Sequence, residues 1–166
     1  MTVISSKKDP EALTLTFVAE FAAPPERVWQ IWEDPRQLER WWGPPTWPAT
    51  FDRHDFVEGG TSSYYMTGPE GDKAGGWWRT TAIAAPTRLE FDDGFADDTG
   101  EPNTELPVTH MVVTLDSVEG GTRMTTVASF ASLDQLEQMV GMGMEEGMAL
   151  AMGQIDELLE GATQRS

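Results

Sequence analysis

The sequence contains no cysteine and only two histidines, His54 and His110, among its 166 residues. Disulfides, thiolate metal sites and cysteine nucleophiles are therefore excluded, and a zinc site is not expected. No stretch reaches the ~20 uninterrupted apolar residues that a membrane-spanning helix needs. The segment 1–11 is polar and carries Lys7 and Lys8 without a following apolar run. We therefore expect no secretory signal, and a cytoplasmic location.

Basic residues are also scarce, with 11 Lys and Arg against 28 Asp and Glu and a formal charge of −17. Such a surface repels phosphate backbones and anionic headgroups, so nucleic acid and membranes are excluded as partners. We interpret the charge as a source of solubility. An acidic group stands at Asp92, Asp93, Asp97, Asp98 and Glu101. Its spacing does not fit a calcium-binding loop, so it is interpreted as a solvated loop and no metal is expected.

Tryptophan, by contrast, is abundant and lies in two groups. The seven residues are Trp29, Trp32, Trp41, Trp42, Trp47, Trp77 and Trp78. Aromatic side chains bury large apolar areas, so we expect most of them in the core.

The first half of the chain predicts one strand, two short helices and then several strands. Apolar residues alternate with polar ones from Ala12 to Phe21, which is typical of a half-buried strand. Pro24 and Pro25 end it. One short helix is predicted with Pro25 in its first turn and with Val28 to Trp32 as its amphipathic part, and a second from Pro35 to about Trp42. Six strand-like segments separated by turn signals follow, at Ala49–Arg53, Gly60–Thr67, Gly75–Ala84, Arg88–Phe95, Val108–Val118 and Thr122–Phe130.

After Phe130 the apolar residues recur at steps of three and four, which predicts one long helix ending near Leu159. A long helix with one apolar face has to bury it, and a curved sheet is the available partner. We therefore predict a single α+β domain over 1–166, with a core from about 12 to 159 and flexible termini. The expected helix-grip architecture is a curved antiparallel sheet of about six or seven strands around the C-terminal helix, with an apolar cavity between them.

Several short motifs resemble those of a known superfamily. They are the run Phe21–Trp29, Trp32, Asp34-Pro35, Trp41-Trp42-Gly43-Pro44, Gly59-Gly60, Gly68–Gly71, Pro86–Leu89, Gly121–Arg123 and Met144–Gly147. In order and spacing they resemble the SRPBCC (START-like) superfamily, and within it the branch named for the activator of heat-shock-protein-90 ATPase. The resemblance covers about Leu13 to Leu159 and implies the helix-grip fold. Similar domains bind lipids, sterols, polyketides or hormones, cyclise polyketides, sequester natural products, or contact a chaperone.

The main hypothesis is binding of a small apolar or aromatic molecule in the internal cavity, without cofactor. The residues expected to line it are Phe17, Trp42, Tyr64, Met66, Trp77, Phe95, His110, Met111, Val113, Met144, Met148 and Met152. The branch usually has a tryptophan where Met148 follows Gly147. Two interpretations of the methionines are open. They simply fill the core, which we favour, or their flexible thioethers leave a more adaptable pocket than a rigid ring would.

Two alternatives remain open. One is a cyclase- or hydrolase-type enzyme that uses an inward-pointing His110, Tyr64 or a pocket carboxylate as acid or base. The other is a chaperone-interacting module, which the name of the branch suggests. Related domains often pair, so a homodimer is also considered.

Overall fold

The computed structural model describes residues 3–97, 99, 101–103 and 105–164. Within them the chain forms one antiparallel sheet in the order β1-β2-β8-β7-β6-β5-β4-β3. Its strands are β1 (Val3–Asp9), β2 (Thr14–Phe21), β3 (Ala49–His54), β4 (Thr61–Thr67), β5 (Lys73–Ala84), β6 (Arg88–Phe95), β7 (Thr109–Val118) and β8 (Gly121–Ser129). The helices are α1 (Pro25–Glu33), α2 (Pro35–Leu38), α3 (Leu133–Gly141), α4 (Met144–Met152) and α5 (Ile155–Gln164). The α+β helix-grip prediction is confirmed, with one more strand than the upper expectation.

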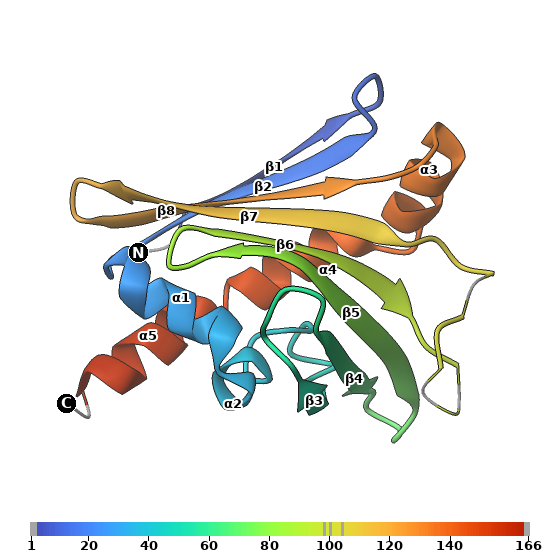
Figure 1. The fold of residues 1–166 in the computed structure, drawn as a ribbon, viewed down its shortest axis with the longest axis horizontal. Helices are drawn as coiled ribbons and strands as arrows, with labels where there is room; N and C mark the ends of the chain where they lie inside the picture. Colours follow the sequence, from blue (N-terminus) through green and yellow to red (C-terminus); the bar gives the residue numbers. More distant parts are fainter. Residues whose placement is uncertain (1–2, 98, 100, 104, 165–166) are drawn as a thin grey trace.

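The sheet is curved, and α1, α2, α4 and α5 lie on its concave side (Figure 1). The backbone of α1 approaches β7 and β8, that of α4 approaches β1 and β2, and α5 packs beside α1. Trp32 of α1 fixes this arrangement, since its indole N–H donates to Met124 Sδ of β8 at 3.4 Å. None of the helices among the described residues is long and apolar enough to cross a membrane.

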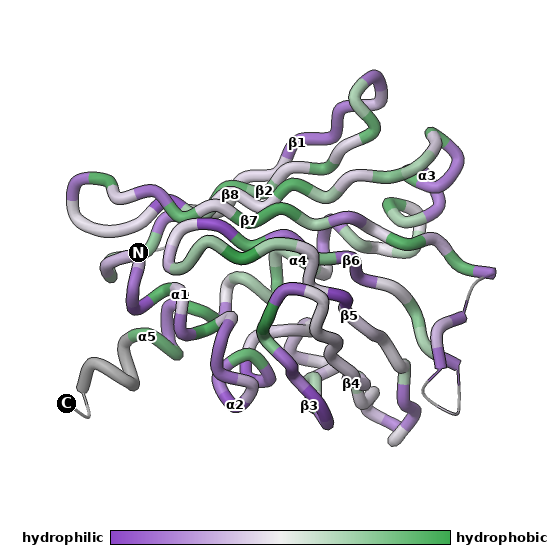
Figure 2. The backbone as a smooth tube through the Cα atoms, in the orientation of Figure 1, coloured by the Kyte–Doolittle hydropathy of each residue, from purple (hydrophilic) through white to green (hydrophobic). Residues whose placement is uncertain are grey.

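The core forms where alternating apolar residues of the strands meet the helices. In β2 the residues Leu15, Phe17 and Ala19 are fully buried, while the residues between them are only partly covered. Figure 2 shows hydrophobic segments along the central strands and hydrophilic residues at the end of β3. The period-two pattern in the sequence therefore identifies the concave face correctly.

Strand β1 was missed by the sequence analysis, which placed the start of the core near residue 12. The polar segment from Ser5 to Asp9 has no apolar alternation to indicate a strand. It pairs in register with β2 through the backbone, with Lys8 opposite Leu15, and the Ser6 hydroxyl donates to Glu145 of α4. An edge strand of this kind is held by main-chain hydrogen bonds, which a hydropathy pattern does not reveal.

The prediction of one long C-terminal helix is wrong in its continuity. The helical segment is divided at Met142-Gly143 and again at Gly153-Gln154. Gly143 has a φ of 90°, a left-handed backbone conformation that interrupts an α-helix and that glycine adopts at little cost. The second short helix also ends earlier than predicted, at Leu38.

Candidate functional site on the concave face

The antiparallel register brings one acidic residue into the aromatic interior. Trp78 of β5 lies opposite Ser62 of β4 and Asp93 of β6, and Tyr64 lies opposite Gly76. Paired residues of an antiparallel sheet point to the same face. Because Trp78 and Tyr64 belong to the buried core, Asp93 also points to the concave face.

Tyr64 and Asp93 form a hydrogen-bonded pair, in which the phenol O–H donates to Asp93 Oδ1 at 2.8 Å. Tyr64 is 9% exposed and Asp93 is part-buried. Burial raises the pKa of Asp93 to about 7, although the bond from Tyr64 acts in the opposite direction. Burial and the nearby carboxylate raise the pKa of Tyr64 well above its usual value. Near neutral pH Asp93 therefore changes its charge while Tyr64 stays protonated and able to donate.

Aromatic rings surround the pair. The Tyr64 ring lies directly over Gly76, where an added Cβ would stand 2.2 Å from the phenol Cζ. It stacks on Phe51 with ring centroids 4.9 Å apart and meets Trp42 edge-on at 6.1 Å. Trp42 in turn packs edge-on against Trp78 at 4.9 Å. Glycine at position 76 is what allows the tyrosine ring to lie flat on β5.

Three polar groups of the same face lack a partner. The Trp78 indole N–H and the hydroxyls of Thr80 and Thr126 are buried without a hydrogen bond to any residue that the structure describes. Buried polar atoms in proteins are nearly always hydrogen-bonded. Each of these groups would gain a hydrogen bond from a polar atom of a guest or a water molecule that entered the core.

Exposure increases along the face toward one end of β4 and β6. Ser62 and Trp78 are almost fully buried, whereas Met66 and Phe95, further along these strands, are part-buried and pack against the core. Asp93 lies between the closed part of the face and this partly exposed end.

Methionines of α4 complete the boundary of the core. Met144 and Met148 are part-buried against it, and Met152 is fully buried. Thioether side chains adapt to irregular spaces at low cost. The part of α4 before Met152 therefore covers the core less completely than the sheet does.

Among the described residues, the space between the sheet and the helices contains a packed core that includes Trp32, Trp41 and Trp42. A hollow of about 420 Å³ lies beside β4 and β5 and is lined by Tyr65, Gly75, Ala96 and Leu106, among others. Further hollows lie over β1 and β2 and at two turns. None of these hollows has a lining residue from α3, α4 or α5. A guest on the concave face has to displace side chains, because the large tryptophan rings fill the space that the sequence analysis expected to be empty.

Ten of the predicted lining residues come together in or against this core. They are Phe17, Trp42, Tyr64, Met66, Phe95, Met111, Val113, Met144, Met148 and Met152. Whether they contact a ligand stays a prediction.

Trp77 and His110 lie on the opposite face of the sheet. Trp77 covers Gly94, where an added Cβ would stand 2.5 Å from the indole, and its N–H donates to the Phe95 carbonyl at 3.1 Å. His110 Nδ1–H donates to Asp92 Oδ1 at 2.8 Å. The prediction that His110 points inward is wrong. Neighbouring residues of a strand point to opposite faces of the sheet, and Met111 points inward.

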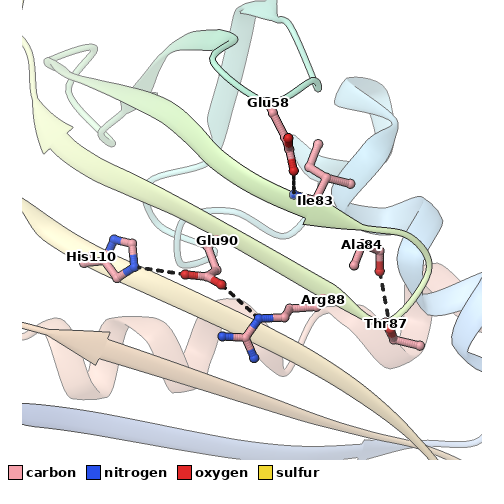
Figure 3. A network of polar contacts seen from close by, with 7 residues as sticks. All are labelled: Glu58, Ile83, Ala84, Thr87, Arg88, Glu90 and His110. Carbon is pink, nitrogen blue, oxygen red and sulfur yellow. Dashed lines mark hydrogen bonds and ion pairs between the residues drawn. The ribbon is translucent and has the colours of Figure 1, made fainter.

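Figure 3 shows the outer face around this histidine. The other ring nitrogen of His110 lies 3.5 Å from Glu90, which also pairs with Arg88 at 2.9 Å. The Arg88 guanidinium is the main cause that lowers the pKa of Glu90. The cluster is a chain of partly exposed ion pairs across β6 and β7.

His54, the second histidine, joins α1 to the sheet. Its Nε2–H donates to the Trp32 carbonyl at 2.9 Å, and Nδ1 accepts from the Ser62 hydroxyl at 2.7 Å. Burial lowers its pKa, which favours the neutral ring. Both ring nitrogens form hydrogen bonds within the protein, so His54 has a structural role.

Asp93 and Trp78 were not among the residues predicted to line this face. Asp93 was assigned to a solvated acidic loop, but it lies within β6. The signal was present, since Leu89, Phe91, Asp93 and Phe95 occupy alternate positions of one strand. No group of three or more histidine, aspartate or glutamate residues that could hold a metal ion occurs among the residues with described positions.

Comparison with known proteins shows the family. Residues 22–160 match the activator of Hsp90 ATPase homolog 1-like protein family. No curated protein matches the chain. Many solved structures are similar to the chain, and three of them are described below.

A solution structure of a protein from Arthrobacter aurescens is 60% identical, with a TM-score of 0.91 over 94% of this chain and 91% of that one. A crystal structure of a protein from Mycobacterium smegmatis is 50% identical, with a TM-score of 0.87 and coverage of 95% and 97%. A protein from Rhodobacter sphaeroides is 27% identical, with a TM-score of 0.80 and coverage of 97% and 99%. The chain therefore belongs to the activator of Hsp90 ATPase homolog 1-like protein family.

Proposed function

We propose that this domain binds a small apolar or aromatic molecule on the concave face, against Tyr64 and Asp93 and beneath α4. The observation that carries the proposal is the Tyr64–Asp93 hydrogen bond of 2.8 Å inside an aromatic core. Ligand sites are mostly apolar and contain a few convergent polar groups that orient the guest. The pair and the free Trp78 N–H supply such groups.

Space for the guest comes from the flexible side chains of α4. Met144 and Met148 are part-buried against the core, and the backbone of α4 lies close to β1, β2 and α3. Gly147 between them leaves open space around its Cα. Rotation of the two thioethers can enlarge the interior without moving the tryptophans.

A panel of hydrophobic small molecules, read by native mass spectrometry and thermal shift, tests the proposal. Met148→Trp places a rigid ring at the boundary of the core and should weaken binding of any hit by about tenfold or more, which is about 1.4 kcal/mol. Leu150→Trp is the matched control, because Leu150 on the same helix is 58% exposed. Equal affinity in the two variants, or no hit across the panel, would remove the proposal.

An acid–base enzyme is the second candidate, and the titration of Asp93 near neutral pH favours it. A general base is most effective when its pKa lies near the working pH. Hits from the panel should then be converted by the wild-type protein, and Asp93→Asn should abolish the conversion while binding persists. Mass spectrometry that recovers every hit unchanged after prolonged incubation would exclude this activity for those compounds.

A further inference from the structure

The carboxyl group of Asp93 has no cationic partner on the concave face. Among the described residues its side-chain hydrogen bond is to Tyr64, and no Lys, Arg or His forms an ion pair with it. The preceding residue, Asp92, points to the outer face and pairs with His110. Arg79, opposite Asp92 in the register, is exposed on that same outer face. The described residues thus supply cations to one face of β6 and none to the other.

A carboxylate in an apolar environment is costly unless a positive charge or hydrogen bonds compensate for it. Tyr64 supplies one hydrogen bond to Oδ1, whereas Oδ2 has no partner in the described part of the chain and stays accessible to solvent. A positively charged group beside Oδ2 would complete the site. The charge of −17 on the whole chain also raises the local concentration of cations around the domain.

The surrounding rings suit the same kind of group. Tyr64 and Trp78 lie on the concave face with Asp93, and Trp42 contacts both rings. Phe51 stacks on Tyr64 and Phe91 stacks on Trp78, so these rings form an apolar wall beside the carboxyl group. A carboxylate among such rings is therefore chemistry that recognises an amine with an apolar body.

We infer that the Tyr64–Asp93 pair is a recognition site for a protonated nitrogen, and that the guest of the concave face is a hydrophobic amine. The ammonium group lies against Asp93 Oδ2, and the apolar body extends toward Met66 and Phe95, where the face is partly exposed. This inference rests on the proposed binding function and adds the chemical class of the ligand.

The test compares naphthylethylamine with naphthylethanol, which have the same aromatic body and differ in charge. Isothermal titration calorimetry at about pH 8 should show the amine binding about tenfold to a hundredfold more tightly than the alcohol, as expected for a charged hydrogen bond. Asp93→Asn should remove this preference, so that the amine and the alcohol bind the variant with similar affinity. Asp92→Asn removes the same charge from the neighbouring residue on the outer face, and it should keep the preference.

The possible results separate the two proposals. Equal affinity of the wild-type protein for amine and alcohol would overturn the amine inference and leave the binding function standing. A preference that survives in Asp93→Asn would also overturn it, because the negative charge of the whole chain would then be its source. Failure of both compounds to bind the wild-type protein would count against the amine inference, while hits from the broader panel would still support the binding function.

Discussion

Replacing Asp93 by asparagine should stabilise the protein, and increasingly so as the pH rises. Asparagine retains an oxygen that accepts the hydrogen bond from Tyr64, but it cannot ionise in the core. The wild-type carboxyl group has a pKa of about 7 in the folded protein against an ordinary value of 3.8. Burial therefore makes ionisation of this group less favourable in the folded state than in the unfolded chain.

The sign of the pH dependence follows from where each state holds the proton. Below the ordinary pKa Asp93 is protonated in both the folded and the unfolded state, so its ionisation does not affect stability. Between 3.8 and about 7 the unfolded chain loses the proton while the folded protein keeps it, so wild-type stability falls as the pH rises. Above this window both states are ionised and the loss stays constant.

The magnitude has an upper limit. At about 1.4 kcal/mol per pKa unit, the rise from 3.8 to about 7 corresponds to about 4 kcal/mol. Asp93 retains partial contact with water, which screens its charge and makes the effect smaller. We expect Asp93→Asn to gain about 1–3 kcal/mol at pH 8 relative to its effect at pH 4.

Urea unfolding followed by tryptophan fluorescence measures this difference across the pH range. Asp92→Asn serves as the control, because Asp92 lies on the outer face beside His110. Tyr64→Phe should raise the pKa of Asp93 further, since the bond from Tyr64 favours the charged form. A stability difference between wild type and Asp93→Asn that does not vary with pH would refute the reasoning, since Asp93 would then titrate normally in the folded protein.

Two further predictions concern glycines. In Gly147→Ala of α4 the added Cβ has no neighbouring atom within 4 Å, so the variant should raise the free energy of unfolding by about 1 kcal/mol. Gly143→Ala should lower it by a similar amount, because position 143 has a φ of 90°. Chemical denaturation of both variants compares them directly. Gly76→Ala should cost about 1–3 kcal/mol, because the new methyl group would stand 2.2 Å from the Tyr64 ring; a normal melting temperature in this variant would show that the ring does not lie over β5.

Much of the fold could be predicted because most strands follow period two. The buried residues of β2 and the central strands carry the alternation directly, and the turns between strands are marked by glycine and proline. Strand β1 could not be found in this way, because its polar residues are held by backbone pairing with β2. The division of the C-terminal helix depends on the backbone angle of Gly143, and a glycine in the sequence permits that angle without requiring it.

The candidate site was predicted only in part, because the orientation of neighbouring aromatic residues is not a matter of hydropathy. Trp77 and Trp78 are equally apolar, so a hydropathy pattern does not distinguish them. They differ in their surroundings, since Trp77 lies over Gly94 whereas Trp78 packs in the aromatic core. Asp93 was assigned by its charge to solvent, although its position in the alternation of β6 pointed inward. A charged residue at an inward position of a strand therefore indicates a functional site, although its charge alone predicts exposure to solvent.

The interruptions on both sides of α4 also determine how the molecule should open locally. A helix of nine residues is too short to be stable by itself in water, so α4 stays helical only while it is docked. One end is attached through Gln154, whose side-chain amide donates to the Gly43 carbonyl at 2.8 Å, and the other follows the left-handed turn at Gly143. Backbone amides of α4 should therefore exchange with deuterium well before those of β7 and β8, through an opening in which the sheet remains intact.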